Sequence, residues 1–302
     1  MTQTLAGRVA VVTGGSRGLD RGMVRALARV GADVVIASRR YDGCALLAEE
    51  DSAGTGSRAL PVACHVGPSA DCDALAEAAY DQFDRVDILV NNAGMAPVYD
   101  RVEDITEELR KKVLGVNLTG TFRRCARIAP SMAADGGGSI VNISSVASVR
   151  PRPNTVPCAA AKARVNAITH AFAHAFGPSV RVNGMMPGTF LTDISRHWDV
   201  EAFERDARTM ALRRFRQPDE IVGTLLYLVS DASSYTTGAL VRSTVGSPSG
   251  LARWARASRR TRPPLRGCPP WRWPASAERA GSRGLPRRPC PAGGTSRPSP
   301  CA

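Results

Sequence analysis

Long apolar runs are absent from this sequence. No run approaches the roughly 18 apolar residues of a membrane-spanning helix, so we expect no transmembrane segment and no membrane partner. Met1 to Gly7 lacks both a basic start and an apolar stretch of the needed length, so we expect no signal peptide. Together with the lack of a disulfide framework described next, these absences predict a cytoplasmic protein in a reducing compartment.

Closely paired cysteines are absent as well. The chain has 8 cysteines, but no two of them form a Cys-x-x-Cys pair. This argues against a zinc site and against a disulfide framework. His170 and His174 lie four residues apart, but Ala171 follows His170 and the zinc motif HExxH is missing. We therefore predict no metal site.

Acidic residues are almost missing from the C-terminal segment. Residues 247–302 contain 12 Arg, no Lys and one Glu, and so carry a net charge of +11 out of the chain's formal +13. The basic total therefore describes this segment, and residues 1–246 are nearly neutral. We predict one domain over 1–246 and a disordered Arg/Pro-rich tail over 247–302. The alternative, a tail that binds nucleic acid, ranks below a tail without a partner.

Apolar stretches typical of buried strands alternate with helical patterns along residues 1–246. The expected strands are Val9–Val12, Asp33–Ser38, Ala59–Cys64, Val86–Gly94, Ser139–Ser144, Val180–Met186 and Ala239–Val241. Helical patterns separate them, the longest over Glu107–Ala134. This alternation predicts an α/β fold with a single doubly wound parallel sheet, a Rossmann domain, covered on both faces. Its ligands would bind at the carboxyl ends of the strands.

The first of these units, Val9 to Asp20, joins a strand, a glycine-rich turn and a helix. Glycines let the backbone approach a ligand, and a helix N-terminus offers unpaired N–H groups, so this unit suits a diphosphate. Gly14-x-Ser16-x-Gly18 also fits the nucleophile elbow of hydrolases. We reject that interpretation because the turn follows the first strand and no histidine has a clear partnering pattern.

Seven motifs carry a family resemblance. They are TGGSRGLD (Thr13 to Asp20), NNAG (Asn91 to Gly94), Val116–Asn117, Ser144–Ser145, AAAK (Ala159 to Lys162), PGTFLT (Pro187 to Thr192) and YTTG (Tyr235 to Gly238). In this order they resemble the short-chain dehydrogenase/reductase family over about Leu5 to Arg242, and within it NADP-dependent 3-oxoacyl reductases and sugar-alcohol dehydrogenases. The resemblance implies hydride transfer between NAD or NADP and the carbonyl or alcohol carbon of a small substrate. It also implies a homodimer or homotetramer.

The resemblance implies four catalytic positions: Asn117, Ser145, Cys158 and Lys162. In the family, the serine hydrogen-bonds the substrate oxygen, and a tyrosine four residues before the lysine exchanges the hydroxyl proton. The lysine lowers that tyrosine's pKa and holds the ribose, and the asparagine positions a water that supplies protons to the lysine. These roles agree with the chemistry, because an alkoxide-like oxygen needs a nearby proton donor and polar stabilisation.

The tyrosine of this arrangement is missing, and Cys158 stands in its place. One hypothesis is a reactive thiolate beside Lys162. We favour the other, a small buried residue without chemistry, because a thiol cannot reach the place of a phenol hydroxyl. Carbonyl reduction should then be slow, and the alternative function is a nucleotide-binding protein with impaired catalysis.

The resemblance also implies the cofactor-binding residues. They are Thr13, Gly14, Ser16, Arg17, Gly18, Leu19, Arg39, Val66, Asn91, Ala93, Gly94, Lys162, Pro187, Gly188 and Thr192. Where the family has a carboxylate for the ribose of NAD, this chain has Arg39, and Arg17 lies in the glycine turn. Two guanidinium groups suit a 2′-phosphate, so we predict NADP. In the alternative both arginines are solvated and NAD is used equally well.

Three further features depart from the family pattern. Asp20 replaces the third glycine of the turn and should repel a diphosphate, and His65 replaces an aspartate that contacts adenine. Beyond Arg242 the usual V-D-G-G is missing, and residues 247–302 contain no Val, Ile, Met, Phe, Tyr, Asn, Asp, Gln, Lys or His. We hypothesise that residues 243–302 are frameshifted; resequencing that finds an intact frame would refute this.

The segment Thr189 to Met210 has no clean helical or strand period, and we predict that it forms a lid over the substrate.

Overall fold

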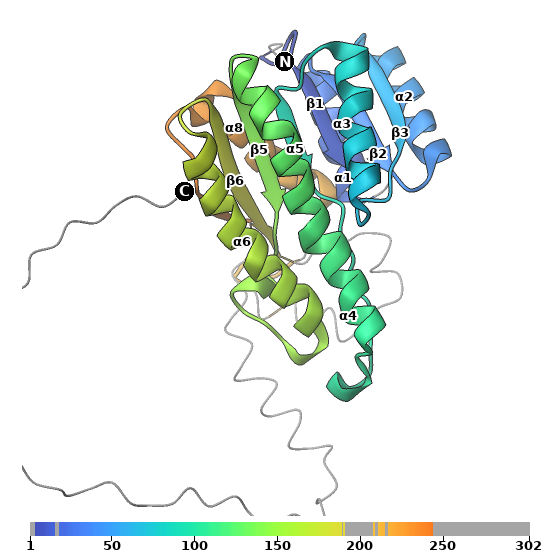
Figure 1. The fold of residues 1–302 in the computed structure, drawn as a ribbon, viewed down its shortest axis with the longest axis vertical. Coiled ribbons are helices and arrows are strands. Elements are labelled where there is room, and N and C mark those ends of the chain that lie inside the picture. The colour runs from blue at the N-terminus through green and yellow to red at the C-terminus, as the bar shows by residue number, and fades with distance from the viewer. Residues whose placement is uncertain are drawn as a thin grey trace, which may run out of the picture. The chain divides into compact units, whose positions relative to one another are not determined.

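The computed structural model describes residues 4–15, 18–188, 190, 208, 211–214 and 217–243, all within one compact unit, Met1–Arg256. In this part of the chain one parallel sheet has the strand order β3-β2-β1-β4-β5-β6-β7 (Figure 1). Its strands are β1 (Val9–Thr13), β2 (Asp33–Ser38), β3 (Ala59–Ala63), β4 (Ile88–Asn91), β5 (Gly138–Ile143), β6 (Val180–Pro187) and β7 (Leu240–Ser243). The order reverses between β1 and β4, the kind of point at which open α/β sheets bind ligands.

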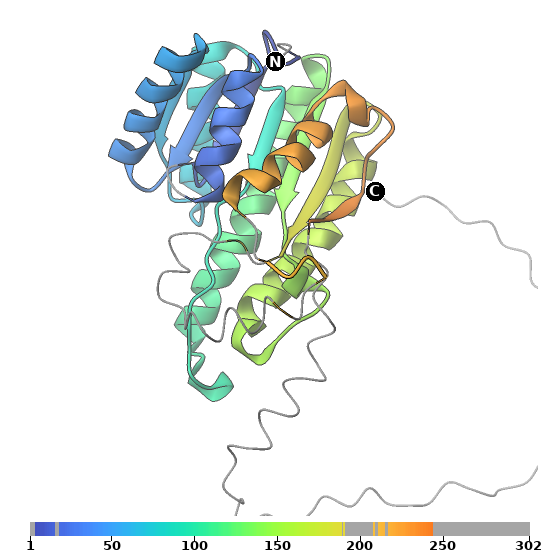
Figure 2. The ribbon, with the colours of Figure 1, turned by 180° about the vertical axis from the view of Figure 1, so that it is seen from behind.

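Helices cover both faces of the sheet. One face carries α3 (Ser69–Phe83), α5 (Gly120–Ala134) and α6 (Val156–Phe176), seen in front in Figure 1. The other carries α1 (Leu19–Arg29), α2 (Tyr41–Thr55) and α8 (Val222–Val229), seen in front in Figure 2. This is the doubly wound α/β arrangement, so the predicted fold class is confirmed.

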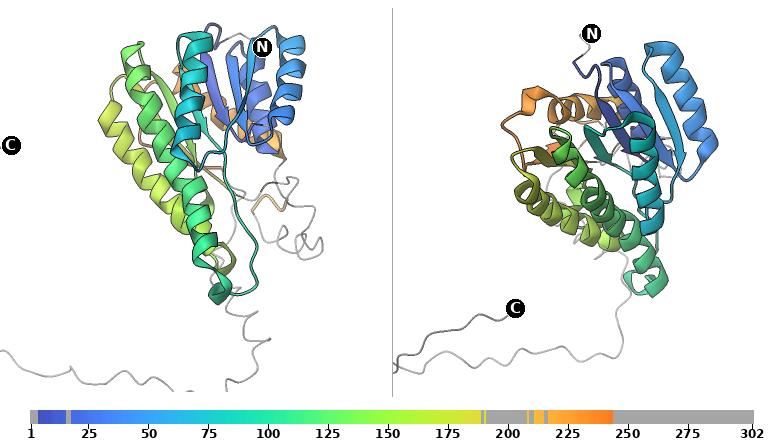
Figure 3. Two further views of the ribbon diagram at one scale, coloured as in Figure 1. Left: turned by 45° about the vertical axis from the view of Figure 1, so that its right-hand side comes forward. Right: turned by 45° about the horizontal axis from the view of Figure 1, so that its top comes forward.

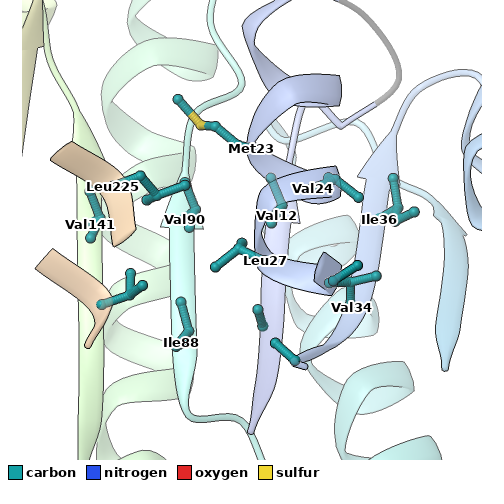
Figure 4. Close-up of a cluster of buried hydrophobic side chains, with 14 of the residues drawn as sticks. Val12, Met23, Val24, Leu27, Val34, Ile36, Ile88, Val90, Val141 and Leu225 are labelled. Atoms are coloured by element: carbon teal, nitrogen blue, oxygen red, sulfur yellow. The ribbon is translucent and has the colours of Figure 1, made fainter. Parts of the chain in front are cut away.

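The strand side chains alternate between two cores. Val12, Ile36 and Val90 point toward α1 and pack against its Met23 and Leu27 (Figure 4). Their neighbours in the strands, among them Val11, Val35 and Leu89, lie in the second core under α3 and α5. Because both faces of the sheet are buried, the strands are expected to be apolar along most of their length, which is the pattern of β1 and β2 in the sequence.

All seven expected strands are present. The helical stretch expected over Glu107–Ala134 is confirmed over its whole length, as α4 (Glu107–Leu114), a π-helical turn (Gly115–Thr119) that was not expected, and α5. Figure 3 shows α4 and α5 following one another beside α6. A π-helical turn carries one extra residue, and such turns are frequent at functional sites.

Several predictions concern residues that the structure does not describe. The expected lid over Thr189–Met210 lies outside the described residues except for Phe190 and Arg208, and so does the tail after Ser243. The domain boundary at residue 246 and the frameshift therefore stay predictions. No helix among the described residues has the length and apolar character needed to span a bilayer.

Candidate cofactor and catalytic site

The turn after β1 is built on glycines. Gly14 has φ +91° and Gly18 has φ +63°, values that glycine adopts without strain. The backbone N–H groups of Gly14 and Gly15 donate to the Ala37 carbonyl at 2.7 Å and 3.2 Å, which ties the turn to β2. A Cβ at Gly15 would lie 2.6 Å from Ile36 Cγ2, so the close packing there requires glycine.

The N-terminus of α1 faces the same edge of the sheet. Gly18 is its N-cap and has no side chain to bind the first N–H groups of the helix, which leaves them for an anion. Leu19 begins the helix. Ser16 and Arg17, and the side chain of Leu19, lie outside the described residues, so their predicted cofactor contacts stay predictions.

The Asp20 carboxylate packs against the glycine turn. Its Oδ1 accepts a hydrogen bond from Asn92 Nδ2, and its Oδ2 lies 2.7 Å from the place where a Cβ on Gly14 would stand. The carboxylate therefore occupies the space beneath the turn that a third glycine would leave open. It also places a negative charge beside a helix N-terminus suited to an anion.

Replacing Asp20 by glycine is expected to tighten NADPH binding by about tenfold, because one like-charge contact of about 1.4 kcal/mol is removed. Calorimetric titration measures the change. Asp20→Asn is the matched control, since it removes the charge and keeps the bulk. Equal affinities for the native chain and Asp20→Gly would contradict the repulsion.

Thr13 ties the turn to the segment after β4. Its hydroxyl donates to the Val90 carbonyl at 3.3 Å and accepts from the backbone N–H groups of Asn92 and Ala93 at 3.2 Å and 3.3 Å. Thr13 is fully buried, so its role within the protein is to hold the loop that carries Ala93 and Gly94 beside the glycine turn.

Gly94, Asn117 and Lys162 come together at the carboxyl ends of β4 and β5. A Cβ on Gly94 would stand 3.4 Å from Asn117 Oδ1 and 3.7 Å from Lys162 Nζ. Asn117, in the π-helical turn, is locked by two 2.8 Å bonds to the backbone N–H and carbonyl of Met95. The absent side chain of Gly94 leaves room for a ligand at both polar groups.

Lys162 is the titratable group at the centre of this arrangement. Its Nζ donates to the Ile143 carbonyl at 2.6 Å, and the side chain is almost fully buried. Burial lowers the pKa of Lys162 from 10.5 to about 8; the nearby Cys158 opposes this shift and Arg124 adds to it. At neutral pH the ammonium is still the main form, but the neutral amine is accessible.

Cys158 lies one helical turn before Lys162 on α6, at the third position of the helix. Its Sγ is 3.6 Å from Asn117 Nδ2, which donates to it. Burial raises the pKa of the Cys158 thiol more than Lys162 lowers it. Burial thus outweighs the nearby ammonium and disfavours a thiolate, so the hypothesis of a reactive thiolate stays an untested prediction.

No tyrosine takes over the missing position. Tyr99 contacts the start of α6, but its hydroxyl is already used there. It donates to the Pro153 carbonyl at 2.7 Å and accepts from the Val156 N–H at 2.8 Å. Tyr227 bonds Thr236, and the side chain of Tyr235 is fully exposed. Among the described residues no tyrosine hydroxyl bonds to Lys162.

Ser145 follows β5 and begins a short 3-10 helix, Val146–Ser148. Its hydroxyl accepts from the Ala147 backbone N–H at 3.1 Å, and its side chain is half-buried. Its neighbour Ser144 is buried and bonded to Asn166 Oδ1 at 2.6 Å, so it supports the site from beneath. The Ser145 hydroxyl keeps its proton to donate to a substrate oxygen.

The side chain of Asn91 faces the protein interior. It donates to Asn142 Oδ1 at 2.9 Å and accepts from Arg124 Nε at 2.7 Å. The Arg124 side chain is fully buried on α5, its hydrogen bonds go to no carboxylate among the described residues, and its Nη2 has no hydrogen-bond partner there. This buried cation was not predicted from the sequence; its place on the apolar stripe of α5 was the only signal.

Four further predicted residues, Val66, Arg39, Pro187 and Gly188, lie at or just beyond the carboxyl ends of β3, β2 and β6. Val66 is buried and its carbonyl accepts from Arg124 Nη1 at 3.4 Å, while His65 Nδ1 accepts from the Gly67 N–H at 3.3 Å. Arg39 follows β2 and is exposed. Pro187 ends β6, and the Gly188 N–H donates to the Ser243 carbonyl at 2.9 Å. Thr192 lies outside the described residues.

The residues present fit a nicotinamide dinucleotide, with one discordant member. The glycine turn and the start of α1, which has no side-chain cap, offer backbone N–H groups for a diphosphate. Gly94 leaves space beside Lys162, which supplies a cation. Asp20 opposes the diphosphate. No group of three or more metal-binding side chains occurs among the described residues.

Comparisons with known proteins agree with this arrangement. The profile of the family described as enoyl-(acyl carrier protein) reductase matches residues 14–246. Rat dehydrogenase/reductase SDR family member 4 is 36% identical over 250 residues, 82% of this chain and 89% of the relative. Short chain dehydrogenase/reductase astE of Aspergillus oryzae is 35% identical over 82% of this chain and 96% of its own length.

Solved structures of dehydrogenases also resemble this chain in fold and sequence. A putative NAD(P)-dependent gluconate 5-dehydrogenase of Beutenbergia cavernae with bound NADP has a TM-score of 0.75 and 32% identity, and the match covers 84% of this chain and 100% of that one. A 7α-hydroxysteroid dehydrogenase complexed with NADH and 7-oxo glycochenodeoxycholic acid has a TM-score of 0.78 and 28% identity, over 83% and 98% of the two chains.

The doubly wound sheet, its glycine turn and the buried lysine thus define a nicotinamide-dependent oxidoreductase acting on a small molecule. The chain belongs to the short-chain dehydrogenase/reductase family. Its class of reaction is the transfer of a hydride between a nicotinamide cofactor and a carbonyl or alcohol carbon.

Proposed function

We propose that this chain is an NADP-dependent carbonyl reductase whose rate is limited by Cys158. The meeting of Gly94, Asn117 and Lys162 at the carboxyl ends of β4 and β5 carries the proposal. In it Lys162 binds the ribose hydroxyls, Ser145 donates to the substrate oxygen, and Asn117 holds a water that supplies protons to Lys162. The bound cofactor supplies the hydride.

Cys158 supports a second candidate, a protein that binds the nucleotide but barely turns it over. The thiol is shorter than a phenol and does not reach the place of a phenol hydroxyl, so the substrate oxygen lacks a positioned proton donor. An NADPH oxidation assay with a panel of ketones and aldehydes separates the two candidates. Slow but measurable turnover by the native chain supports the reductase, and binding without turnover supports the second candidate.

The preference for NADP rests on Arg39. This arginine follows β2 directly and is exposed at the edge where a ribose 2′-phosphate would lie. Arg39→Asp is expected to weaken NADP binding by about 10- to 100-fold and to spare NAD, because a charge-assisted bond contributes about 1.5–3 kcal/mol. Paired titrations with both cofactors measure this.

The matched control is Arg110→Asp on the exposed side of α4, which changes the net charge equally without touching the β2 edge. It should leave the ratio of the two affinities unchanged. Equal affinity of the native chain for NAD and NADP would remove the basis for the phosphate clamp.

We also infer a homodimer or homotetramer that uses the α5–α6 surface. Phe122 on α5 is 49% exposed and meets Phe172 of α6 edge to face at 5.6 Å, and Phe172 stacks on Phe176 at 5.7 Å. Phe172 is buried and Phe176 half-buried, so Phe122 presents the exposed edge of this aromatic group, and an exposed aromatic side chain of this kind is typical of a subunit contact.

Phe122→Glu is expected to convert the assembly to monomers, measured as molar mass by light scattering. Leu46→Glu on α2, which is 59% exposed on the opposite face of the sheet, is the control and should leave the mass unchanged. A native chain that is already monomeric would contradict the inference.

A further inference from the structure

Lys162 is unusual among the amines of this protein. The whole chain has three lysines, Lys111, Lys112 and Lys162. The first two are exposed on α4, whereas Lys162 is almost fully buried and lies among polar groups at the carboxyl ends of the sheet. Its Nζ makes one hydrogen bond among the described residues, to the Ile143 carbonyl, and its other N–H bonds have no partner there.

The space beside this amine is larger than a tyrosine would allow. Cys158 lies one turn before Lys162 on the same face of α6, and its short side chain ends at Asn117 Nδ2. Gly94 adds no side chain on the other side, where a Cβ would be 3.7 Å from Nζ. A carbon atom placed beside Gly94 would therefore contact Lys162 Nζ, so a small carbonyl compound that entered there would meet the amine directly.

We propose that Lys162, when the cofactor site is free, forms an imine with small aldehydes and ketones. The inference goes beyond hydride transfer, because it assigns a covalent reaction to a residue that otherwise binds the ribose. The Nζ of the neutral amine adds to the carbonyl carbon and gives a carbinolamine. Loss of water, which takes the carbonyl oxygen and two protons, leaves the C=N bond; no oxidant or reductant is involved.

The electrostatics of the pocket favour this reaction. Imine formation needs a neutral amine, and burial lowers the pKa of Lys162 to about 8. Near pH 8 Lys162 therefore offers about 100-fold more neutral amine than an exposed lysine. Among the described residues the titratable groups that act on Nζ are Cys158 on its own helix and Arg124 on α5; Arg124 favours the neutral form and Cys158 opposes it.

The test uses the full chain, acetaldehyde as the probe and cyanoborohydride, which reduces the imine to a stable ethylamine. Intact mass counts the ethyl groups, and peptide mapping separates Lys162 from Lys111, Lys112 and the amino group of Met1. The expected result is that Lys162 is ethylated at least tenfold faster than Lys111 and Lys112 near pH 8, and that NADPH slows this reaction and no other.

Two variants keep the result decisive. Lys162→Met should lose the fast ethylation and keep the slow ones. The double variant Lys111→Arg, Lys112→Arg keeps Lys162 as the sole lysine and should retain the fast reaction even if Lys162→Met fails to fold.

The proposal is overturned if Lys162 reacts no faster than Lys111. Bound NADPH that leaves a fast Lys162 reaction unprotected would instead contradict the ribose-binding role of Lys162 and leave the imine chemistry in place. The two failures are therefore distinguishable.

Discussion

Replacing Cys158 by tyrosine is expected to raise NADPH-dependent carbonyl reduction by about 10²–10⁴-fold, the usual contribution of a positioned general acid. The new phenol would lie one helical turn before Lys162, whose ammonium stabilises the phenolate. Asn117, locked by Met95, already stands at the base of this position. Steady-state NADPH oxidation with a ketone panel measures the gain.

Cys158→Phe is the matched control for this experiment. Phenylalanine fills the same volume without the hydroxyl, so it should give no gain in rate. A phenylalanine variant as fast as the tyrosine variant would show that bulk is the limiting property. A native enzyme that already works at the rate of Cys158→Tyr would contradict the role assigned to the missing hydroxyl.

Replacing Lys162 by methionine is expected to stabilise the protein while abolishing its activity. Because burial lowers the pKa of Lys162 from 10.5 to about 8, the ammonium is less stable in the folded chain than in the unfolded chain. Below pH 8 both states hold the proton and the penalty, about 3 kcal/mol, is fully present. Between pH 8 and 10.5 the unfolded chain binds more protons, so stability rises with pH until the penalty is gone.

Urea unfolding of the native chain and Lys162→Met across pH 7 to 10.5 tests this. The variant should be more stable at pH 7, and the difference should shrink as the pH rises, since methionine has no proton to lose. Lys112→Met makes the same change at an exposed lysine and should show no such trend. A difference that stays constant with pH would contradict the buried ammonium.

The sheet was predictable because its strands are buried on both faces. Val9–Thr13 and Asp33–Ser38 are apolar along almost their whole length, and such short runs between helical patterns have few other solutions. The glycine turn was predictable for a related reason, because the positive φ of Gly14 and Gly18 requires residues without a Cβ.

The π-helical turn at Asn117 could not be predicted from the sequence. Gly115–Thr119 interrupts a run that has helical character on both sides, and one extra residue per turn leaves no mark in the apolar spacing. The turn decides where the Asn117 amide points, so the sequence named the residue and the backbone supplied its geometry.

Arg124 was missed because charged residues are expected at the surface. Its position on α5 falls among Thr121, Cys125 and Ile128, all buried, but periodicity alone gives no reason to bury a guanidinium there. The bonds to Asn91 and to the Val66 carbonyl come from strands and loops distant in the chain. Tertiary structure alone reveals this network and its effect on Lys162.

The central claim is that the turn at Thr13–Asp20 and the Lys162 pocket together form a working cofactor site that lacks only its proton donor. Calorimetric titration of the full chain with NADPH tests this claim most directly. The predicted result is saturable binding of one NADPH per chain, competed by NADP and unchanged in Cys158→Tyr. A native chain that binds no NADPH would contradict the claim, whether or not the Cys158→Tyr variant binds it.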